Sequence, residues 1–305
     1  MTARVFIDGE AGTTGLGIRE RLRDVAGITI ESLPAERRKD ARARQDMMRA
    51  VDLVVLCLPD DAARESVALA AALGAQAPRV LDSSTAFRVA PDWTYGFAEL
   101  APGQDRAIAG AARVANPGCY PTGAIALLRP LVDAGLVPAD TPIGIHATSG
   151  YSGGGKAMIA AHEATGGPAF ELYALGLEHK HVVETQFYGG LTRRPIFTPA
   201  VGHFPQGMVV SIPLHLDLLP GTVRGTDLQD CLASHYRGAG MIRVLPAEAA
   251  GVLDATALAG TDLLELRVFA NDARRQAVLV ARLDNLGKGA SGAAVQNIRL
   301  MLGLA

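Results

Sequence analysis

The chain has 305 residues, of which 49% are apolar and 20% are charged, and its formal net charge is −2 at pH 7. This length and apolar content are enough for large buried cores and indicate two domains. The small net charge and a sequence pI of about 6.4 argue against a nucleic-acid-binding or membrane-surface protein, and no apolar run is long enough to span a bilayer.

The cysteines and the N-terminus indicate a cytoplasmic protein. The three cysteines are Cys57, Cys119 and Cys231. Their odd number and spacing suggest neither a disulfide framework nor a metal site. The first residues enter a strand-like pattern at once and lack the basic-then-apolar layout of a signal peptide.

A glycine-rich turn follows the first predicted strand, residues 4–8, and leads into a helical pattern. Strand, turn and helix in this order are the context of a dinucleotide-binding fingerprint, in which glycines let the backbone approach a pyrophosphate. Two threonine hydroxyls add donors. The predicted cofactor contacts here are Gly9, Gly12, Thr13, Thr14 and Gly15.

A basic cluster follows the second predicted strand, residues 28–33. An enzyme that prefers NAD usually carries an acidic residue near this point, whereas guanidinium groups suit the 2′-phosphate of NADP. Arg37 and Arg38 therefore favour NADP. The alternative is a solvated run of charges with no ligand.

The remaining strands of the first half complete a doubly wound parallel sheet. The apolar run 52–59 predicts a strand buried on both faces, with Pro59 at the end that faces the adenosine part of the cofactor. A helix over 62–73 and a strand over 79–82 follow. Ser84, beyond that strand, is placed at the ligand crevice because the carboxyl ends of parallel strands line it.

The stretch from Asn116 to Gly123 contains the strongest chemical signal. Pro121 suits the first turn of a helix, where a backbone N–H is not needed. Cys119 then lies at a helix N-terminus, where unpaired N–H groups and the helix dipole favour an anion. We expect this thiol to ionise more easily than a free one and to be the only reactive thiol of the three.

A glycine- and serine-rich loop follows a predicted strand at 143–148. Residues 149–156 offer backbone N–H groups and hydroxyls to an anionic substrate, unless they are a flexible linker. The predicted substrate contacts are Ser149, Gly150 and Lys156.

The segment 173–184 holds the densest cluster of proton-transfer candidates. A thiolate mechanism needs a partner that titrates near neutral pH, and histidine is the usual one. His179 and His181 are both candidates, and Glu184 is a predicted substrate contact. Two histidines at this spacing could also be a metal pair or structural residues.

The second half predicts an α+β domain. Residues 207–217, 263–271 and 276–283 alternate as antiparallel strands with one buried face, and a helix is expected over 226–236. The other sheet face carries apolar residues, which suggests a partner subunit. Small residues after Asn285, a predicted cofactor contact, precede a C-terminal helix over 293–304.

The chain resembles the N-acetyl-γ-glutamyl-phosphate reductases, specifically their shorter type. The resemblance is carried by residues 6–15, 116–123, 146–156, 179–181 and 288–297. It implies reduction of N-acetyl-γ-glutamyl phosphate by NADPH, with release of phosphate, in arginine biosynthesis. It also implies a homodimer or homotetramer and a Rossmann-like NADP-binding domain over 1–118 and 286–305. The inserted domain, 119–285, would then serve catalysis, substrate binding and oligomerisation.

The resemblance assigns roles to individual residues. Cys119 matches the family's nucleophile, and His179 matches its acid/base, with His181 an alternative. Lys180 stands where the longer type has arginine, so its role is left open. Asn116, Ser149, Gly150, Arg88, Arg113 and Lys156 are candidates for holding the acyl group and the phosphate.

Two other functions compete with this one. Aspartate-semialdehyde dehydrogenases use the same chemistry on another acyl phosphate, but their cysteine loop differs. A non-catalytic NADP-binding sensor would not need the intact Cys119 and the nearby histidines.

Overall fold

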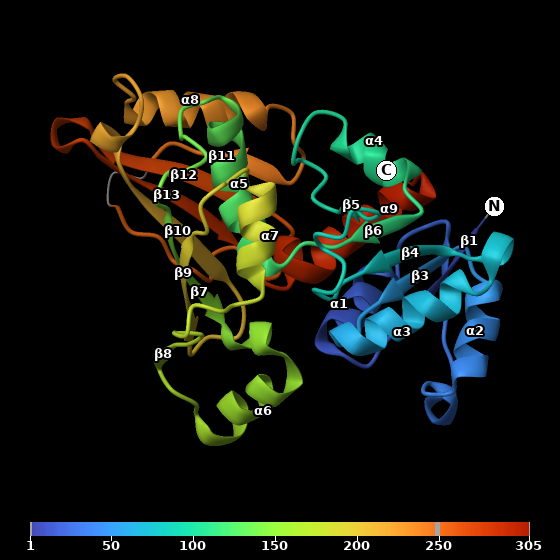
Figure 1. Ribbon diagram of the computed structural model, residues 1–305. Coiled ribbons are helices and arrows are strands. Elements are labelled where there is room, and N and C mark those ends of the chain that lie inside the picture. The colour runs from blue at the N-terminus through green and yellow to red at the C-terminus, as the bar shows by residue number, and fades with distance from the viewer. Residues whose placement is uncertain (1, 248–250, 305) are drawn as a thin grey trace. The chain divides into compact units, whose positions relative to one another are not determined.

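The structure is a computed structural model that describes residues 2–247 and 251–304 (Figure 1). It divides into two units, which are Met1–Gly118 with Ala290–Ala305 (unit 1) and Cys119–Gly289 (unit 2). Within the described residues, no helix combines the length and the apolar character that crossing a membrane requires.

Unit 1 is built on a parallel sheet with the order β2-β1-β3-β4-β6-β5. Its strands are β1 (Ala3–Asp8), β2 (Ile28–Glu31), β3 (Leu53–Leu56), β4 (Arg79–Asp82), β5 (Thr94–Tyr95) and β6 (Arg113–Ala115). Its helices are α1 (Thr13–Leu22), α2 (Ala41–Arg49), α3 (Asp60–Ala71), α4 (Gln104–Gly110) and α9 (Gly292–Leu302). This arrangement confirms the predicted doubly wound sheet.

Both faces of this sheet are covered, which explains its continuous apolar strands. On β3, Leu53 and Val55 pack in one core with residues of α1 and α9. Val54 and Leu56 point to the opposite face and pack in a second core with α2 and α3. Because strand side chains alternate between faces, a strand buried on both sides needs an apolar residue at every position.

The strand order places a binding crevice at one edge of this sheet. β1 lies between β2 and β3, so the chain passes from β1 to one side to form β2 and then returns across β1 to form β3 on the other side. In open α/β sheets, ligands bind beyond the carboxyl ends of the strands at such a switch point. The glycine-rich turn after β1 is therefore at the expected position for a cofactor.

Unit 2 contains a seven-stranded sheet with the order β11-β12-β13-β10-β7-β9-β8. Its strands are β7 (Gly144–Gly150), β8 (Phe170–Leu172), β9 (Ile196–Gly202), β10 (Met208–His215), β11 (Ile242–Val244), β12 (Leu264–Asn271) and β13 (Gln276–Leu283). Its helices are α5 (Cys119–Asp133), α6 (Gly155–Thr165), α7 (His181–Tyr188) and α8 (Gly225–His235). The sheet is mostly antiparallel as predicted, but β7 pairs with β9, and β11 with β12, in parallel.

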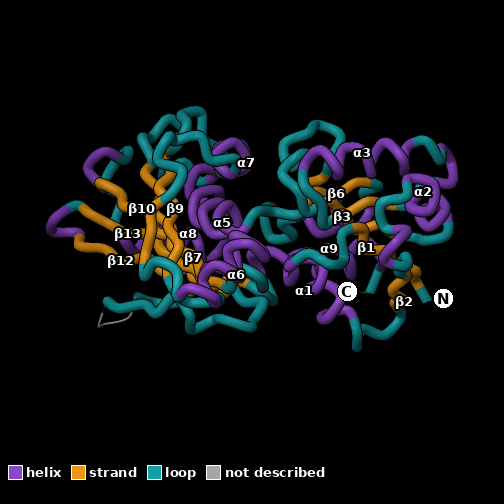
Figure 2. The backbone as a smooth tube through the Cα atoms, turned by 90° about the horizontal axis from the view of Figure 1, so that it is seen from below, coloured by secondary structure: helices purple, strands orange, loops and turns teal. Residues whose placement is uncertain are grey.

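Helix α5 lies on this sheet and is almost entirely buried (Figure 2). Its close approach depends on Gly123, where a Cβ atom would come within 2.9 Å of Val210 Cγ2 and 3.3 Å of Ala281 Cβ. A larger residue would push the helix away from β10 and β13. The helix that begins at Cys119 is thus fixed by packing over its length.

Candidate active site

Cys119 is the first residue of α5 and is partly exposed. The first N–H groups of an α-helix have no partner within it, so they can bind a negative charge at this end. Gly289 packs behind the cysteine, since a Cβ there would approach Cys119 Cβ to 2.9 Å and Asp284 O to 3.0 Å. The backbone at Gly289 therefore packs directly against Cys119 within unit 2.

An aromatic cluster lies beside Cys119. Tyr120, the next residue, donates its hydroxyl hydrogen to Ala200 O (3.1 Å) and accepts one from Tyr173 (3.2 Å). The rings of His179 and His181 lie 6.1 and 5.9 Å from that of Tyr120, centroid to centroid. The structure thus gathers the predicted thiol and both predicted histidines around two tyrosines that the sequence did not single out.

The two phenols stay protonated. Burial is the main cause that raises the pKa of Tyr120 far above its usual value, and the neighbouring Tyr173 and Cys119 add to it. Burial is also the main cause that raises the pKa of Tyr173 to about 12, and the charge of Cys119 adds to it. A thiolate at Cys119 is therefore close enough to influence both hydroxyls, which remain donors at neutral pH.

His179 has a defined tautomer. Its Nδ1 accepts a hydrogen bond from the backbone N–H of His181 (3.1 Å), so in the neutral ring the proton is on Nε2. His179 is partly exposed, whereas His181 is buried at the first residue of α7. The His179 Nε2–H is therefore the better placed of the two to reach a substrate.

The loop before His179 is bent by unusual backbone angles. Ala174 and Leu177 have φ values of 52° and 61°, and Leu177 N donates to Ala174 O (3.0 Å). This region is unfavourable for residues with a Cβ, and such strain often occurs at functional sites. The bend brings the Tyr173 and His179 rings to 5.7 Å, centroid to centroid.

The glycine- and serine-rich loop uses part of its backbone internally. The N–H groups of Gly150, Tyr151 and Ser152 donate to carbonyls of the segment 204–207, at 2.9, 2.9 and 3.2 Å. At these three residues the donors predicted to face a substrate are therefore already bonded. Gly150 has to be glycine because a Cβ would lie 2.6 Å from Pro205 O.

The side chains predicted to bind substrate differ in their accessibility. Lys156 is exposed in the first turn of α6. Ser149 is buried, where its hydroxyl donates to Gly150 O (3.0 Å), and Glu184 is 2% exposed within α7. Asn116 lies in unit 1, and its amide is bonded to Ala290 O and to Asn297.

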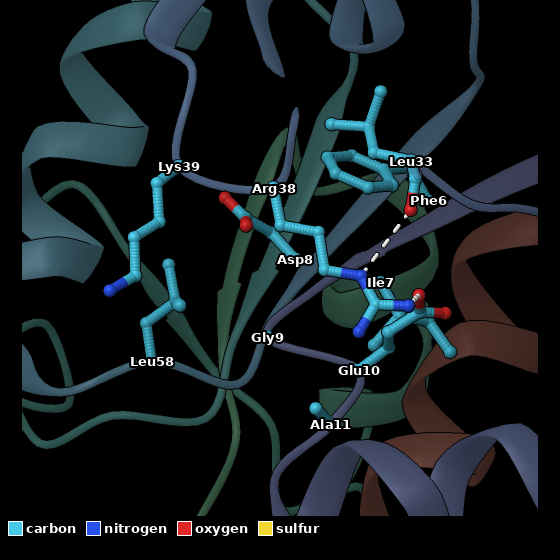
Figure 3. A pocket seen from close by; sticks show the side chains of 10 residues that line it. All are labelled: Phe6, Ile7, Asp8, Gly9, Glu10, Ala11, Leu33, Arg38, Lys39 and Leu58. Carbon is cyan, nitrogen blue, oxygen red and sulfur yellow. Dashed lines mark hydrogen bonds and ion pairs between the residues drawn. The ribbon is translucent and has the colours of Figure 1, made fainter. Parts of the chain in front are cut away.

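Unit 1 contains a pocket at the carboxyl ends of its first three strands (Figure 3). Its volume is about 170 Å³. The pocket is lined by Phe6, Ile7, Asp8, Gly9, Glu10, Ala11, Leu33, Arg38, Lys39 and Leu58. Gly9 has φ +92°, and a Cβ there would lie 2.3 Å from Cys57 O, so the turn requires glycine at this position.

The charges of this pocket fit a phosphorylated nucleotide. Arg38 and Lys39 line it, while Arg37 is exposed in the 3₁₀ helix Ala35–Arg37 and does not. Two carboxylates also line the pocket, and both are compensated: Asp8 pairs with Arg44 (2.8 Å), and Glu10 pairs with Arg38 (2.7 Å) and Arg19 (2.6 Å). The lining therefore keeps positive charge beside the glycine turn, where a nucleotide carries its phosphates.

The other predicted cofactor contacts are spread over both units. In unit 1, Thr13 and Thr14 begin α1 and Pro59 precedes α3. Ser84 donates to Asp82 Oδ2 (2.6 Å). Asn285 lies in unit 2, where its amide accepts from Gly207 N (2.9 Å) and donates to Ser152 Oγ (2.8 Å).

Two further candidates have other positions. Arg113 forms an ion pair with Asp92 (2.6 Å), and the buried Arg88 donates to Ser83 O (3.3 Å). Across residues 2–247 and 251–304, no group of three or more His, Cys, Asp or Glu side chains is arranged to hold a metal ion.

Comparisons with known proteins cover nearly the whole chain. Residues 10–108 match the family described as semialdehyde dehydrogenase, NAD binding domain, and residues 119–285 match semialdehyde dehydrogenase, dimerisation domain. The N-acetyl-gamma-glutamyl-phosphate reductase of Brucella ovis is 53% identical over 311 aligned positions, which cover 99% of this chain and all of that protein. The same enzyme of Brucella anthropi is also 53% identical, with 99% of each chain covered.

Solved structures show the same fold at low identity. Aspartate semialdehyde dehydrogenase II from Vibrio cholerae superposes with a TM-score of 0.73 at 18% identity, covering 99% of both chains. Aspartate semialdehyde dehydrogenase with NADP from Candida albicans gives 0.68 at 15% identity, again covering 99% of both chains.

Selective alkylation tests the reactivity of the three thiols. Burial, with the nearby charges of Asp82 and Asp8, raises the pKa of Cys57 to about 12, and burial also raises the pKa of Cys231. Iodoacetamide at neutral pH should therefore modify Cys119 first, as read by peptide mass spectrometry. Comparable modification of Cys57 in the folded protein would contradict this assignment.

Replacement of Asp82 should affect stability in a pH-dependent way. Burial raises the pKa of this carboxyl from 3.8 to about 6, against the lowering effect of Ser84. Since the folded-state value is the higher one, the wild type loses stability as pH rises from about 4 to about 6. Asp82→Asn should then raise the free energy of unfolding by about 3 kcal/mol at neutral pH and by little at pH ~4, measured by urea unfolding.

The exposed Asp24 offers a matched control for this measurement. Asp24→Asn should leave the difference in the free energy of unfolding between pH ~4 and neutral pH as it is in the wild type. An equal increase in the free energy of unfolding for Asp82→Asn at both pH values would show that ionisation of the carboxyl does not cause the stabilisation.

Proposed function

The chain belongs to the family of the N-acetyl-gamma-glutamyl-phosphate reductases, and we propose that it reduces N-acetyl-γ-glutamyl phosphate to N-acetylglutamate semialdehyde in arginine biosynthesis. The reaction uses NADPH and releases phosphate. The observation that carries this proposal is Cys119 at the start of α5, with the His179 and Tyr173 side chains gathered beside it.

Cys119 acts as the nucleophile. Its thiolate attacks the carbonyl carbon of the acyl phosphate, and the bond to the phosphate oxygen breaks, which leaves a thioester on the sulfur. The positive end of the helix dipole at the start of α5 stabilises the thiolate and the oxyanion that develops on the carbonyl oxygen.

A bound reduced nicotinamide supplies the hydride that reduces this thioester. The Nε2–H of His179 donates a hydrogen bond to the oxyanion of the resulting thiohemiacetal and shares its proton with that oxygen until the carbon–sulfur bond breaks. The hydrogen bond from His181 N to His179 Nδ1 supports this role, because it keeps the proton on Nε2. Aldehyde release then restores the thiolate.

The cofactor is NADPH in this proposal. The acidic residue at the end of β2, Glu31, is bonded to Arg4 (3.0 Å) and does not line the pocket. The next residue is Ser32, which is too short to exclude a 2′-phosphate. With Arg38 and Lys39 in the lining, this end of the pocket attracts a phosphate more strongly than a bare ribose.

Lys156 is the proposed partner for the anionic groups of the substrate. Its exposure in the first turn of α6 supports this role. Ser149 is proposed as a contact through its bond network with Tyr120, beside Cys119. Asn116 is buried and its amide donates to Ala290 O, so it is proposed as a residue that fixes this backbone segment. Glu184, which is buried in α7, remains a proposed substrate contact.

Aspartate-semialdehyde reduction is the second candidate activity. The solved aspartate semialdehyde dehydrogenases share the fold at 13 to 18% identity, which carries no substrate assignment. The relatives at 53% identity are N-acetyl-gamma-glutamyl-phosphate reductases over their full length. We therefore propose N-acetyl-γ-glutamyl phosphate as the substrate, because the relatives at 53% identity are much more similar to this chain.

We propose a cytoplasmic homo-oligomer with two copies as its smallest form. The match of residues 119–285 to a dimerisation domain supports association through unit 2. Three cysteines without a disulfide support a reducing compartment.

The function is tested by assaying oxidation of the aldehyde in the reverse, phosphate-dependent direction. The wild type should reduce NADP with N-acetylglutamate semialdehyde and not with aspartate semialdehyde. Cys119→Ser should lower kcat by about 10³-fold or more while leaving the Kd for NADPH within about 2-fold. Full activity of Cys119→Ser, or equal rates with both aldehydes, would overturn the proposal.

Substitution of each histidine tests the proton-transfer assignment. His179→Gln should lower kcat by about 10² to 10³-fold with little change in KM, because proton transfer is lost while the fold is kept. His181→Gln is the matched control and should cost less than about 10-fold, since its contribution to His179 is a backbone N–H. The reverse ranking would assign the acid/base role to His181.

A further inference from the structure

Glu10 places a carboxylate in the nucleotide pocket, which is unexpected beside a site proposed for a phosphate. It lies in the glycine turn after β1, and its side chain extends toward the end of β2, where Arg38 meets it (Figure 3). Glu10 is only 8% exposed. A buried carboxylate here has to be explained, because a negative charge repels a phosphate.

Both oxygens of this carboxylate are bonded. Oε1 pairs with Arg38 Nη2 (2.7 Å), and Oε2 pairs with Arg19 Nη1 (2.6 Å) and accepts from Ser32 Oγ (2.8 Å). Arg19 Nη1 also donates to Ser32 Oγ (2.8 Å). Helix α1 and the segment that follows β2 thus meet at the side chain of Glu10.

These contacts restrain two long cationic side chains. Arg38 also donates from Nε to Leu33 O (3.3 Å), so its guanidinium is held on two sides. The side chains of Arg19 and Arg38 are nevertheless 47% and 42% exposed. A guanidinium has more N–H groups than one carboxylate can accept, so Arg38, which lines the pocket, can bind a second anion there, and Arg19 keeps exposed N–H groups beside it.

The charge balance decides between attraction and repulsion. One carboxylate at Glu10 faces the guanidinium groups of Arg38 and Arg19, and Lys39 adds a further positive charge in the lining beside Arg38. The cluster is therefore positive as a whole. A free arginine side chain loses rotamer entropy when it binds a ligand, and a restrained one does not lose that entropy again.

We propose that Glu10 is a positioning residue that sets the preference for a 2′-phosphate, by holding Arg38 and Arg19 in place before the cofactor binds. The inference rests on the proposed use of NADPH. It adds a residue inside the glycine turn to the determinants of cofactor choice, and it makes the geometry of the arginines, rather than their charge alone, responsible for discrimination.

Direct binding measurements test this inference without the chemical step. NADPH and NADH are titrated into the full chain, and their Kd values are read from nicotinamide fluorescence. Glu10→Gln should weaken NADPH binding about 10-fold and leave NADH within about 2-fold, because only the 2′-phosphate uses the held arginines. Glu31→Gln is the matched control, since Glu31 pairs with Arg4 outside the pocket, and it should change neither value.

Glu10→Asp separates position from charge and is the second variant if Glu10→Gln does not fold. It keeps the negative charge but moves the carboxylate back by one methylene, out of reach of Arg38. It should weaken NADPH binding as Glu10→Gln does. Unchanged NADPH binding in Glu10→Asp would overturn the positioning role.

Two other results would overturn the inference. Tighter NADPH binding in Glu10→Gln would show that the carboxylate mainly repels the phosphate. Equal losses for NADPH and NADH would show that Glu10 merely shapes the turn. A wild type that binds NADH as tightly as NADPH would instead overturn the proposed cofactor, and this is seen before any variant is made.

Discussion

The position of the reactive sulfur depends on close packing at two glycines. Gly123 lets α5 lie against β10 and β13, and Gly289 lets the backbone pass directly behind Cys119. A side chain at either position would displace the start of the helix, and the Cys119 side chain with it. The position of Cys119, and with it the chemistry attributed to this residue, therefore depends on a steric constraint in the core of unit 2.

Electrostatics then decide what the two units bind. In unit 2, the helix start favours an anion, while the two buried phenols remain neutral donors beside it. In unit 1, acidic side chains are kept from repelling a phosphate by pairing, Asp8 with Arg44 and Glu10 with Arg19 and Arg38. In each unit, the charge that remains uncompensated matches the chemistry of the proposed ligand.

Much of the fold could be predicted from local patterns. Continuous apolar runs indicated the two-sided parallel sheet, and Cys119 was correctly placed at a helix start. The parallel pairs β7–β9 and β11–β12 in unit 2 could not be predicted, because a half-buried strand alternates in the same way in parallel and antiparallel pairs. The strand β9 was missed since it contains Pro199, and proline is rare inside sheets.

The site was harder to predict because its bonds connect residues far apart in sequence. Asn116 and Asn285 lie next to recognisable motifs, yet their amides are used to hold backbone segments together. Glu10, Arg19, Ser32 and Arg38 form one network that no spacing reveals. Tyr120 and Tyr173 gain their place beside the thiol only when residues 173–181 fold over the start of α5.

The covalent intermediate is the central claim, and intact-mass spectrometry tests it most directly. The enzyme is mixed with N-acetyl-γ-glutamyl phosphate in the absence of any reduced nicotinamide. The account predicts that the chain gains the mass of the acyl group at Cys119 and that one equivalent of phosphate is released. Phosphate release only after NADPH is added, with no acylated chain detected, would contradict it.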